Sequence, residues 1–276
     1  MKQTSVYDYY KSLGWSTQNG IYRDTLVNEN LQHAALQYNT DTRRRVLRIL
    51  HSLSSERFYS LLDCASGPIQ YPEYLEYSRL FTKRVCIDFS ETALQAARVN
   101  LINDSQPNCE FICKDFLDFE IKSNSFDAAI SLHTLYHVQL EKQEQFVEKL
   151  IAVTKPGGLV IVVYSNPFSF RSFIRIPSAI TMRFWGGLRG KLFGKKINSN
   201  GIYCKRHRRL WWTRFNKLGH VSFCAYRLFT PSFEKKFIPD NKFGAWIYKI
   251  LFRIEECKFS VPFADYYIAV IRKFSG

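Results

Sequence analysis

Short apolar runs alternate with amphipathic stretches between residues 58 and 164. The run FYSLLD at 58–63 stops at a turn signal, as a buried strand does, and RVCID at 84–88 repeats the pattern. Ser90 then precedes an amphipathic helix expected at 91–102, where a serine caps well. Three more strands are expected at 109–113, 126–132 and 159–164, and two more helices at 73–80 and 141–154. This alternation predicts an α/β fold, with a parallel sheet between two layers of helices.

The regular alternation of predicted strands and helices stops on both sides of this region. Residues 1–57 predict a helical N-terminal cap, with helices at 24–38 and 41–53, and residues 165–205 are basic, aromatic and broken by proline and glycine. After this insertion, residues 206–276 predict the C-terminal part of the same fold. Its elements are two helices and two strands, at 206–217, 243–257, 221–228 and 264–272.

Composition narrows the class of protein. The 276 residues are 46% hydrophobic and 23% charged, as in a globular protein, and no apolar run reaches the roughly 18 residues of a membrane span. The start, MKQTSVYDYY, lacks the apolar run of a secretory signal. The seven scattered cysteines fit reduced thiols rather than disulfides or a zinc site. We therefore expect a cytoplasmic protein without a metal.

The net charge of +15 comes from one block, because residues 149–233 hold 16 Lys or Arg and no Asp or Glu. Such a block attracts phosphates, acidic substrates or an anionic surface. Between 168 and 196 the cations alternate with aromatic rings, which fits a lid over an anionic acceptor, a membrane contact or an RNA contact. These uses stay open, and so does a plain packed cap.

Candidate ligand contacts follow successive strands. Asp63 and Gly67 follow the first strand, Asp88 ends the second, and Asp115-Phe116 follows the third. Ligands of an open parallel sheet bind at the carboxyl ends of its strands, where Asp88 could accept ribose hydroxyls and Asp115-Phe116 could flank an adenine. The turn after the first strand has one glycine, whereas the dinucleotide-binding motif G-x-G-x-x-G has three, and this difference argues against NAD as the ligand. The spacing thus predicts an adenosine site.

Four motifs in order carry a family resemblance. LLDCASGPIQYPEY, RVCIDFS, CKDFLDF with SFDAAISLHTLYHV, and KLIAVTKPGGLVIVVY resemble class I S-adenosylmethionine-dependent methyltransferases. The resemblance implies a Rossmann-like fold with a mostly parallel seven-stranded sheet, residues 58–164 as its cofactor-binding core, and S-adenosylmethionine as cofactor. ASGPIQYPEYLEYS and SLHTLYHV resemble, more narrowly, small-molecule methyltransferases of glycan and specialised-metabolite pathways.

The resemblance also implies roles for the first turn. Asp63 and the backbone of Ala65, Ser66 and Gly67 would hold the methionine moiety of the cofactor. The sequence Ala-Ser-Gly-Pro replaces the usual multi-glycine turn here, so the contacts to the methionine end are the point at which this chain departs from the family pattern.

Four further residues would hold the nucleoside. Asp88 would bind the ribose with Phe89 beside the adenine, and Asp115 and Phe116 would flank the adenine. The N-terminal tyrosines, among them Tyr7 and Tyr10, have two uses open to them, which are ordinary packing and closure over the cofactor.

The passage to the acceptor would be lined by Ser131, Leu132 and His133 at the end of the fourth strand. Methyl transfer needs an aligned acceptor, and a hydroxyl acceptor also needs a base of near-neutral pKa. His133 and His137, four residues apart, share a face if the segment is helical. We favour His137 as base over His133; a merely structural role for both stays open.

The sequence therefore predicts O-methylation of a sugar, glycolipid or specialised metabolite. The acceptor is expected to be a small molecule, anionic or lipid-linked, with peripheral contact to a membrane surface. Nucleic acid is disfavoured as a partner, since no separate RNA-binding module or NPPY-like motif occurs. The alternatives are an RNA methyltransferase and a non-catalytic scaffold that binds the cofactor.

Overall fold

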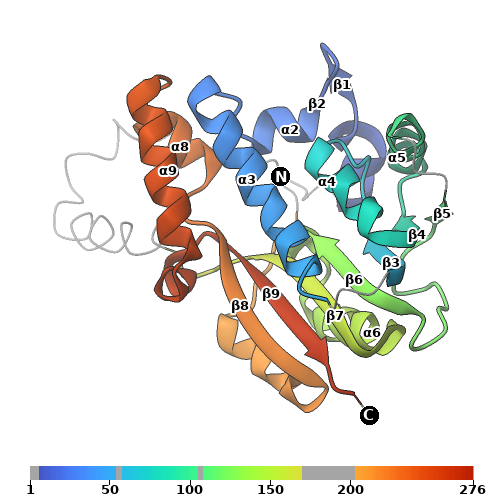
Figure 1. The fold of residues 1–276 in the computed structure, drawn as a ribbon. Coiled ribbons are helices and arrows are strands. Elements are labelled where there is room, and N and C mark those ends of the chain that lie inside the picture. The colour runs from blue at the N-terminus through green and yellow to red at the C-terminus, as the bar shows by residue number, and fades with distance from the viewer. Residues whose placement is uncertain (1–5, 54–57, 105–107, 170–202, 276) are drawn as a thin grey trace, which may run out of the picture.

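The fold is built on one seven-stranded sheet with helices on both faces (Figure 1). The computed structural model describes residues 6–53, 58–104, 108–169 and 203–275. The strand order is β5-β4-β3-β6-β7-β9-β8, and only β9 runs antiparallel to its neighbours β7 and β8. The strands are β3 Phe58–Cys64, β4 Phe81–Asp88, β5 Cys109–Cys113, β6 Phe126–Leu132, β7 Thr154–Ser165, β8 Gly219–Arg227 and β9 Tyr266–Lys273. The predicted fold class, a Rossmann-like α/β fold with a mostly parallel seven-stranded sheet, is confirmed.

Helices and short turns fill the two outer layers. Strands β1 Thr17–Gln18 and β2 Ile21–Tyr22 form a separate hairpin near the N-terminus. The α-helices are α1 Val6–Tyr9, α2 Arg23–Asn28, α3 His33–Leu50, α4 Pro72–Glu76, α5 Glu91–Asn103, α6 Gln143–Val153, α8 Pro231–Phe237 and α9 Lys242–Glu256. The remaining helical turns are η1 Tyr10–Gly14, η2 Tyr77–Leu80, η3 Leu135–His137, η4 Leu140–Lys142, η5 Arg209–Lys217 and η6 Lys258–Phe263.

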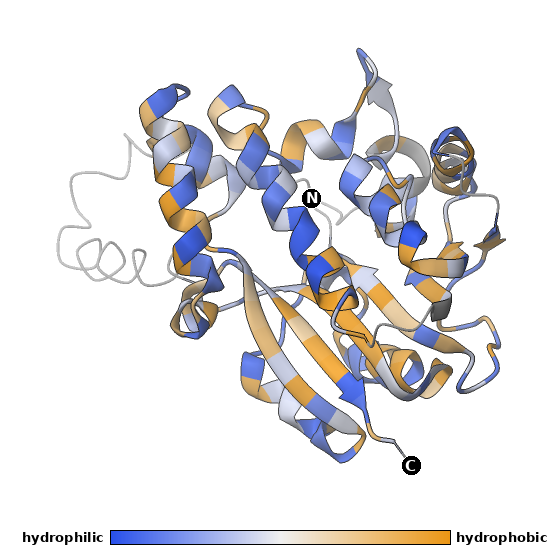
Figure 2. Cartoon of the chain, viewed as in Figure 1, coloured by the Kyte–Doolittle hydropathy of each residue, from blue (hydrophilic) through white to orange (hydrophobic). Residues whose placement is uncertain are grey.

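The central strand β7 shows why its sequence is continuously apolar. Ile161 and Val163 pack in a cluster with α3, whereas Val160 and Val162 pack in the larger cluster that includes α6 and η5. Successive side chains of a strand point to opposite faces, so a strand covered on both faces needs apolar residues throughout. Figure 2 shows these strands as the most hydrophobic part of the chain.

Long-range contacts override two local predictions. Helices were expected at 24–38 and 41–53, but the break lies at 29–32, between α2 and α3, and α3 runs through residues 39–40. Asn39 is buried there and donates to the carbonyl of Asn30 at 2.7 Å, which ties the helix to the segment before it. The KPGG turn expected at 155–158 lies inside β7, where the pairing with β6 shifts register near Phe126. Tertiary contacts outweigh weak turn and helix propensities at both places.

The predicted division into cap, core and insertion stays a prediction. Within the cap, α3 packs against α9 of the C-terminal part, so these segments share one core. The part of the predicted lid at 170–202 lies outside the described residues. None of the helices in the described ranges is long and apolar enough to cross a lipid bilayer.

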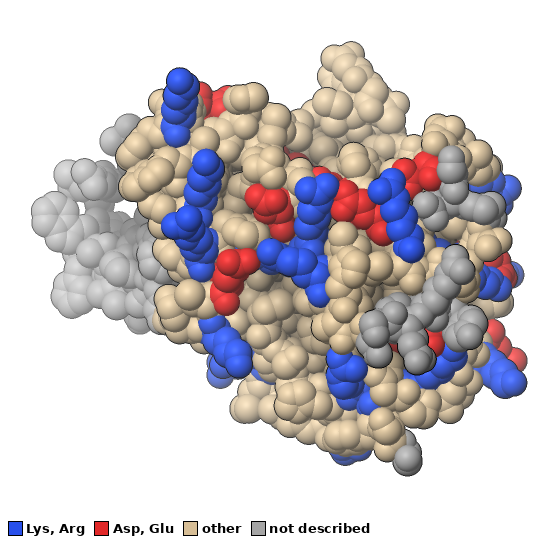
Figure 3. All heavy atoms as spheres, in the orientation of Figure 1, with Lys and Arg blue, Asp and Glu red and all other residues tan. Residues whose placement is uncertain are grey.

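Charges of both signs alternate on the face formed by α3 and α4 (Figure 3). Arg44 pairs with Glu76 at 2.7 Å, and Arg43 lies 3.4 Å from Glu73 and 3.7 Å from Glu29. The excess positive charge of the chain therefore does not gather on this face.

Candidate functional site

Unusual backbone conformations gather at the carboxyl ends of β3 and β6. Ala65, Ile69 and His133 have φ angles of 55°, 50° and 60°, and Gly67 has 59°. Non-glycine residues seldom adopt such angles, and where they do, a functional site is a common reason. The two adjacent strand ends are thus shaped where an α/β sheet binds its ligands.

Asp88 is the best-placed acid at this edge. It is buried, and its two carboxylate oxygens accept hydrogen bonds from the backbone N–H of Gly67 at 2.9 Å and of Ser90 at 2.8 Å. Burial raises the pKa of Asp88 to about 6, against the opposing effect of these hydrogen bonds. Each oxygen keeps lone-pair capacity, so the carboxylate can also accept ribose hydroxyls.

The turn after β3 uses its own backbone donors internally. The N–H groups of Ala65 and Ser66 both donate to the carbonyl of Ile87, at 2.7 and 3.2 Å, and the N–H of Gly67 donates to Asp88. These three donors are therefore occupied by the end of β4. The predicted methionine contact through this backbone stays a prediction, and it requires these bonds to be shared or exchanged.

Asp63 is also engaged within the protein. One carboxylate oxygen pairs with the buried guanidinium of Arg84, which also donates to the carbonyl of Tyr74 at 2.7 Å and to Ser78 Oγ at 2.8 Å. This pair ties β3 to β4 and to the turn before β4. A structural role for Asp63 is thereby visible, and its predicted contact to the methionine moiety stays untested.

Aromatic side chains of the N-terminal segment cover the same edge. The Tyr7 ring lies 5.1 Å from that of Phe89, and Trp15 packs on Tyr10 with ring centroids 5.0 Å apart. A Cβ atom on Gly67 would come within 3.2 Å of the Trp15 ring. The sequence left packing and closure open for these tyrosines, and the structure places them directly over the predicted cofactor contacts.

The predicted adenine contacts separate in space. Asp115 is exposed and accepts a hydrogen bond from the N–H of Leu117 at 2.8 Å, which fixes the loop after β5. Phe116 is only 5% exposed and packs edge-on against Phe146. The Phe116 ring therefore belongs to the core beneath the loop. Of the two predicted adenine contacts, only Asp115 is exposed, together with the backbone of its loop.

His137 is oriented as a proton acceptor. Its Nδ1 lies 2.8 Å from the carbonyl oxygen of Tyr203, which can only accept, so Nδ1 carries the proton and Nε2 keeps its lone pair. Burial lowers the pKa of His137 below its ordinary 6.5, although the bond to Tyr203 opposes the shift. A neutral imidazole with a fixed tautomer is the form that a general base requires.

His133 has different surroundings. Its ring lies between those of Tyr226 and Tyr266, at centroid distances of 5.1 and 5.3 Å, and its Nδ1 lies 3.4 Å from the hydroxyl of Tyr136. Burial, followed by the positive charge of Arg227, lowers the pKa of His133 to about 3. The expected shared helical face is not formed, since η3 begins only at Leu135.

Ser131 and Leu132, also predicted to line the passage, sit at the end of β6. The Ser131 side chain is completely buried, and its hydroxyl has no hydrogen-bond partner among the described residues. Leu132 is half-buried and packs with the cluster on the α3 side of the sheet. Their predicted roles stay predictions.

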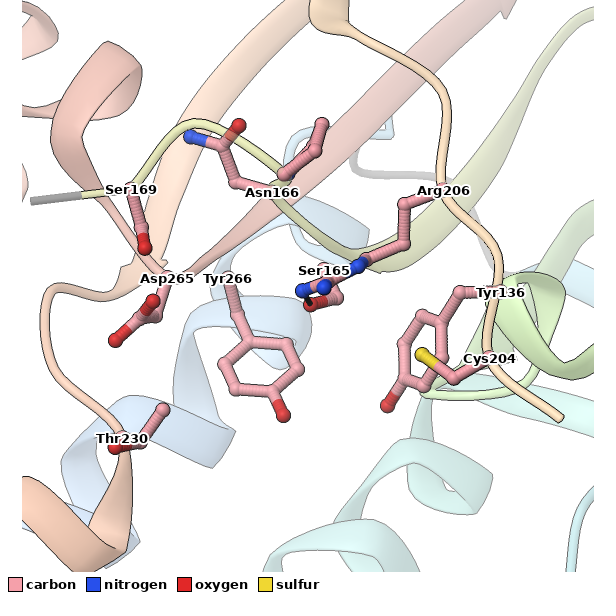
Figure 4. Close-up of a pocket in the computed structure, with 10 residues that line it drawn as sticks. Tyr136, Ser165, Asn166, Ser169, Cys204, Arg206, Thr230, Asp265 and Tyr266 are labelled. Atoms are coloured by element: carbon pink, nitrogen blue, oxygen red, sulfur yellow. Dashed lines mark hydrogen bonds between the residues drawn. The ribbon is translucent and has the colours of Figure 1, made fainter. Parts of the chain in front are cut away.

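A polar cavity of about 280 Å³ opens next to His133, between the ends of β7 and β9 (Figure 4). Tyr136 and Tyr266, which both line this cavity, also contact His133. The guanidinium of Arg206 points into it and donates to Ser165 Oγ at 3.1 Å, the one hydrogen bond that this group of five N–H donors makes within the described part of the chain. Its walls are Tyr136, Ser165, Asn166, Pro167, Ser169, Cys204, Arg206, Thr230, Asp265 and Tyr266.

Sequence reasoning did not single out these cavity residues. Tyr136 lies between the two candidate histidines, and Arg206 belongs to the basic cluster KRHRR whose use stayed open. Tyr266 and Asp265 begin the last strand, about 130 residues away from Tyr136 along the chain. Only the antiparallel pairing of β9 with β7 brings them together, and no local pattern signals that contact.

Comparison with known proteins identifies the central segment. Residues 62–162 match the protein family described as methyltransferase domain. The tRNA N(3)-cytidine methyltransferase METTL2 of Gallus gallus is 31% identical over 113 residues, which cover 39% of this chain and 30% of that protein. METTL2 of Bos taurus is 23% identical over 179 residues, covering 58% of this chain and 46% of its own. The chain thus spans less than half the length of these relatives.

Solved structures share the fold across almost the whole chain. The N-methyltransferase NodS from Bradyrhizobium japonicum, in complex with S-adenosyl-l-homocysteine, superposes with a TM-score of 0.51 at 13% identity, covering 91% of this chain and 95% of NodS. The expectation that disfavoured nucleic acid is wrong, because two of the relatives with detectable sequence identity are tRNA methyltransferases. A third, EEF1A lysine methyltransferase 2 of Danio rerio, is 24% identical over 136 residues, which cover 47% of this chain and 58% of that protein. Absence of a separate RNA-binding module was a weak argument, since a basic surface on the catalytic domain can serve instead.

Proposed function

Because residues 62–162 are a class I S-adenosylmethionine-dependent methyltransferase domain, we propose that this chain transfers a methyl group to a polar acceptor that carries phosphate. The predicted enzyme class and its cofactor, S-adenosylmethionine, are confirmed at the level of this domain. The acceptor atom is a nitrogen or an oxygen seated in the cavity beside Tyr136 and Tyr266. The arrangement of Arg206 in that cavity is the observation that carries the proposal.

The chain's own groups divide the work of the reaction. S-adenosylmethionine supplies a methyl group on a sulfonium, which is already activated for displacement. Asp88 binds the ribose, and Tyr136 and Tyr266 hold the acceptor away from bulk water, so alignment provides most of the rate. Nε2 of His137 takes the proton that the acceptor releases.

Arg206 supports a phosphate-bearing acceptor because a guanidinium binds phosphate oxygens through paired N–H donors. The surrounding segment 203–217 holds six Lys or Arg and no Asp or Glu. Of these six, Arg214 and Lys217 pair with Glu144 and Glu148 on α6. Lys205, Arg208 and Arg209 stay next to Arg206 as a local positive field that attracts phosphates.

RNA is the first candidate acceptor. Partial similarity to tRNA methyltransferases supports it, and so does the cationic segment that borders the cavity. A nucleotide flipped into the cavity would be flanked by Tyr136 and Tyr266, while Arg206 would contact a phosphate.

A small phosphate-bearing metabolite or glycolipid is the second candidate. The cavity favours it, because about 280 Å³ bounded by ten residues of the chain matches a compact polar molecule. The predicted O-methylation of a sugar or glycolipid falls within this candidate.

The two candidates separate in one labelling experiment. Purified protein is incubated with methyl-labelled S-adenosylmethionine and, separately, with total RNA, a polar metabolite extract and a lipid extract. Label in a single pool, lost with Asp88→Ala and reduced with Arg206→Ala, identifies the acceptor class. Tight cofactor binding without label in any pool would instead favour the non-catalytic scaffold and overturn the proposal.

A further inference from the structure

The outward side of α9 carries large apolar residues that stay exposed in the described structure. Phe243, Trp246 and Ile250 are 60%, 54% and 36% exposed. They lie three and four positions apart, so they form one stripe along the helix. The Phe243 and Trp246 rings stack with centroids 5.6 Å apart. We call this row, with the cations beside it, the α9 outer stripe.

The opposite side of α9 already fixes the helix to the protein. Tyr248 accepts a hydrogen bond from the side chain of Asn30 at 2.7 Å, and Glu255 accepts one from the Tyr38 hydroxyl at 2.6 Å. Leu251 is buried between them. Packing within the described residues therefore explains the inner side of α9 but not the exposed apolar row on its outer side.

Cations flank the exposed rings. Lys242, Lys249 and Arg253 project on the same outward side, adjacent to the aromatic row. Figure 2 shows polar and hydrophobic residues mixed along α9, and Figure 3 shows Lys and Arg side chains following one another down this part of the surface. The chain repeats the pairing just before and just after the helix, with Lys236 beside Phe237 and Lys258 beside Phe259, whose rings are 59% and 67% exposed.

We propose that the α9 outer stripe docks on an anionic lipid surface, with the helix lying in the plane of the membrane interface. Aromatic rings and an isoleucine enter the headgroup region, and flanking cations bind lipid phosphates. The helix has 15 residues, about 22 Å, which is too short to span the hydrocarbon layer.

Lipid fits this stripe better than nucleic acid. The cations are mostly lysines, which act as point charges and can extend along an apolar surface, whereas RNA surfaces favour the planar guanidinium of arginine. Ile250 and the phenylalanines add apolar surface, which a lipid layer would remove from water and a phosphate-rich RNA surface would leave hydrated.

The segment that contains α9 also borders the proposed acceptor cavity. Thr230 precedes α8 and Asp265 follows η6, and both residues line the cavity. The segment with α8, α9 and η6 therefore begins and ends at the cavity wall. Asn166 in the wall donates to the carbonyl of Pro262 in η6 at 3.0 Å. Docking through α9 would hold the cavity close to a membrane surface, whichever acceptor it receives.

Vesicle co-sedimentation of the full chain tests the proposal. We expect binding to vesicles of phosphatidylglycerol and phosphatidylcholine, little binding to phosphatidylcholine alone, and weaker binding at high salt. The double variant Phe243→Ser, Trp246→Ser should lower the partition coefficient about tenfold. A double variant Lys242→Glu, Lys249→Glu should abolish the preference for anionic lipid.

Matched surface variants serve as controls. Ile102→Ser removes an equally exposed apolar residue from α5, and Lys122→Glu reverses a charge far from α9 along the chain; both should bind vesicles like the unchanged protein. Cofactor affinity and melting temperature check that each variant folds. Vesicle binding that the α9 variants leave intact would overturn the proposal, and so would an α9-dependent loss of RNA binding without any vesicle binding. Because the readout needs no methyl transfer, it stands apart from a failure of the proposed function.

Discussion

The cofactor edge and the acceptor cavity lie side by side but are built in different ways. The cofactor edge comes from the ends of β3, β4 and β6, which all lie between residues 58 and 132. The cavity combines Tyr136 with Arg206 and Tyr266, which come from three distant parts of the chain. The residues predicted to hold the donor therefore come from short-range motifs, whereas the residues of the proposed acceptor cavity come together only through long-range packing.

The difference teaches where function can diverge. Strand ends that shape a turn, as at Gly67 and Asp88, tolerate little change because their backbone donors and acceptors are paired with each other. Cavity walls made by loops and by the edges of β7 and β9 can change side chains without moving the sheet. A substitution in one region should therefore change the binding or turnover that depends on that region and leave the other region unaffected.

The largest effect is expected for His137→Ala. Loss of the base should lower kcat about 100-fold, because a positioned general base contributes at least that much, while the dissociation constant for cofactor stays the same. Steady-state kinetics and calorimetry measure the two quantities. For the unchanged protein, kcat/KM should fall as the pH drops below 6.5, since the pKa of His137 lies below that value. Unchanged kcat in His137→Ala would remove this residue as the base.

Asp88→Ala should weaken cofactor binding at least about tenfold. The substitution removes the acceptor for the ribose hydroxyls and leaves the N–H groups of Gly67 and Ser90 without their partner. Isothermal titration with S-adenosyl-l-homocysteine measures the effect. Glu91→Ala, at an exposed position on the same loop and helix, is the control that should bind normally. Equal affinity in all three proteins would refute the ribose assignment.

Arg206→Ala should raise KM for the acceptor about fivefold and leave cofactor affinity unchanged. The guanidinium contributes a charge-assisted contact to the acceptor phosphate, at a site open to solvent ions. Arg214→Ala, in the same segment but paired with Glu144, is the matched control with no expected change in KM. An equal rise in KM for both variants would mean that general charge, rather than the cavity, attracts the acceptor.

The smallest effect is a pH dependence of cofactor affinity. Ribose binding needs ionised Asp88, whose pKa burial raises to about 6, so affinity should fall about twofold on going from pH 8 to pH 6 and further below it. Asp88→Asn should bind weakly without this dependence. Binding titrations at several pH values measure cofactor affinity alone. They therefore separate the loss of affinity on protonation of Asp88 from the loss of turnover on protonation of His137. A flat affinity between pH 8 and pH 5 would contradict the assignment.

The sequence predicts the cofactor edge well for a physical reason. Buried strands and their capping turns leave local patterns, so β3 to β7, the cap at Ser90 and the site of Asp88 follow from short stretches of chain. Partners within the fold leave no such pattern: the pairing of Asp63 with Arg84, the burial of Phe116 and the bond from His137 to Tyr203 all depend on packing. The charge of the chain predicts an anionic partner, which stays a prediction, and charge alone does not distinguish RNA, metabolite and lipid.

The last strand of the sheet has a consequence for biosynthesis. Because β9 lies between β7 and β8, the ribosome must release residues 266–273 before β8 can join the sheet. A nascent chain can order the five parallel strands, which come earlier, and still lack the wall that Asp265 and Tyr266 provide. Translation thus delivers the strands of the predicted donor-binding edge before it delivers the residues of β9 that complete the wall of the proposed acceptor cavity.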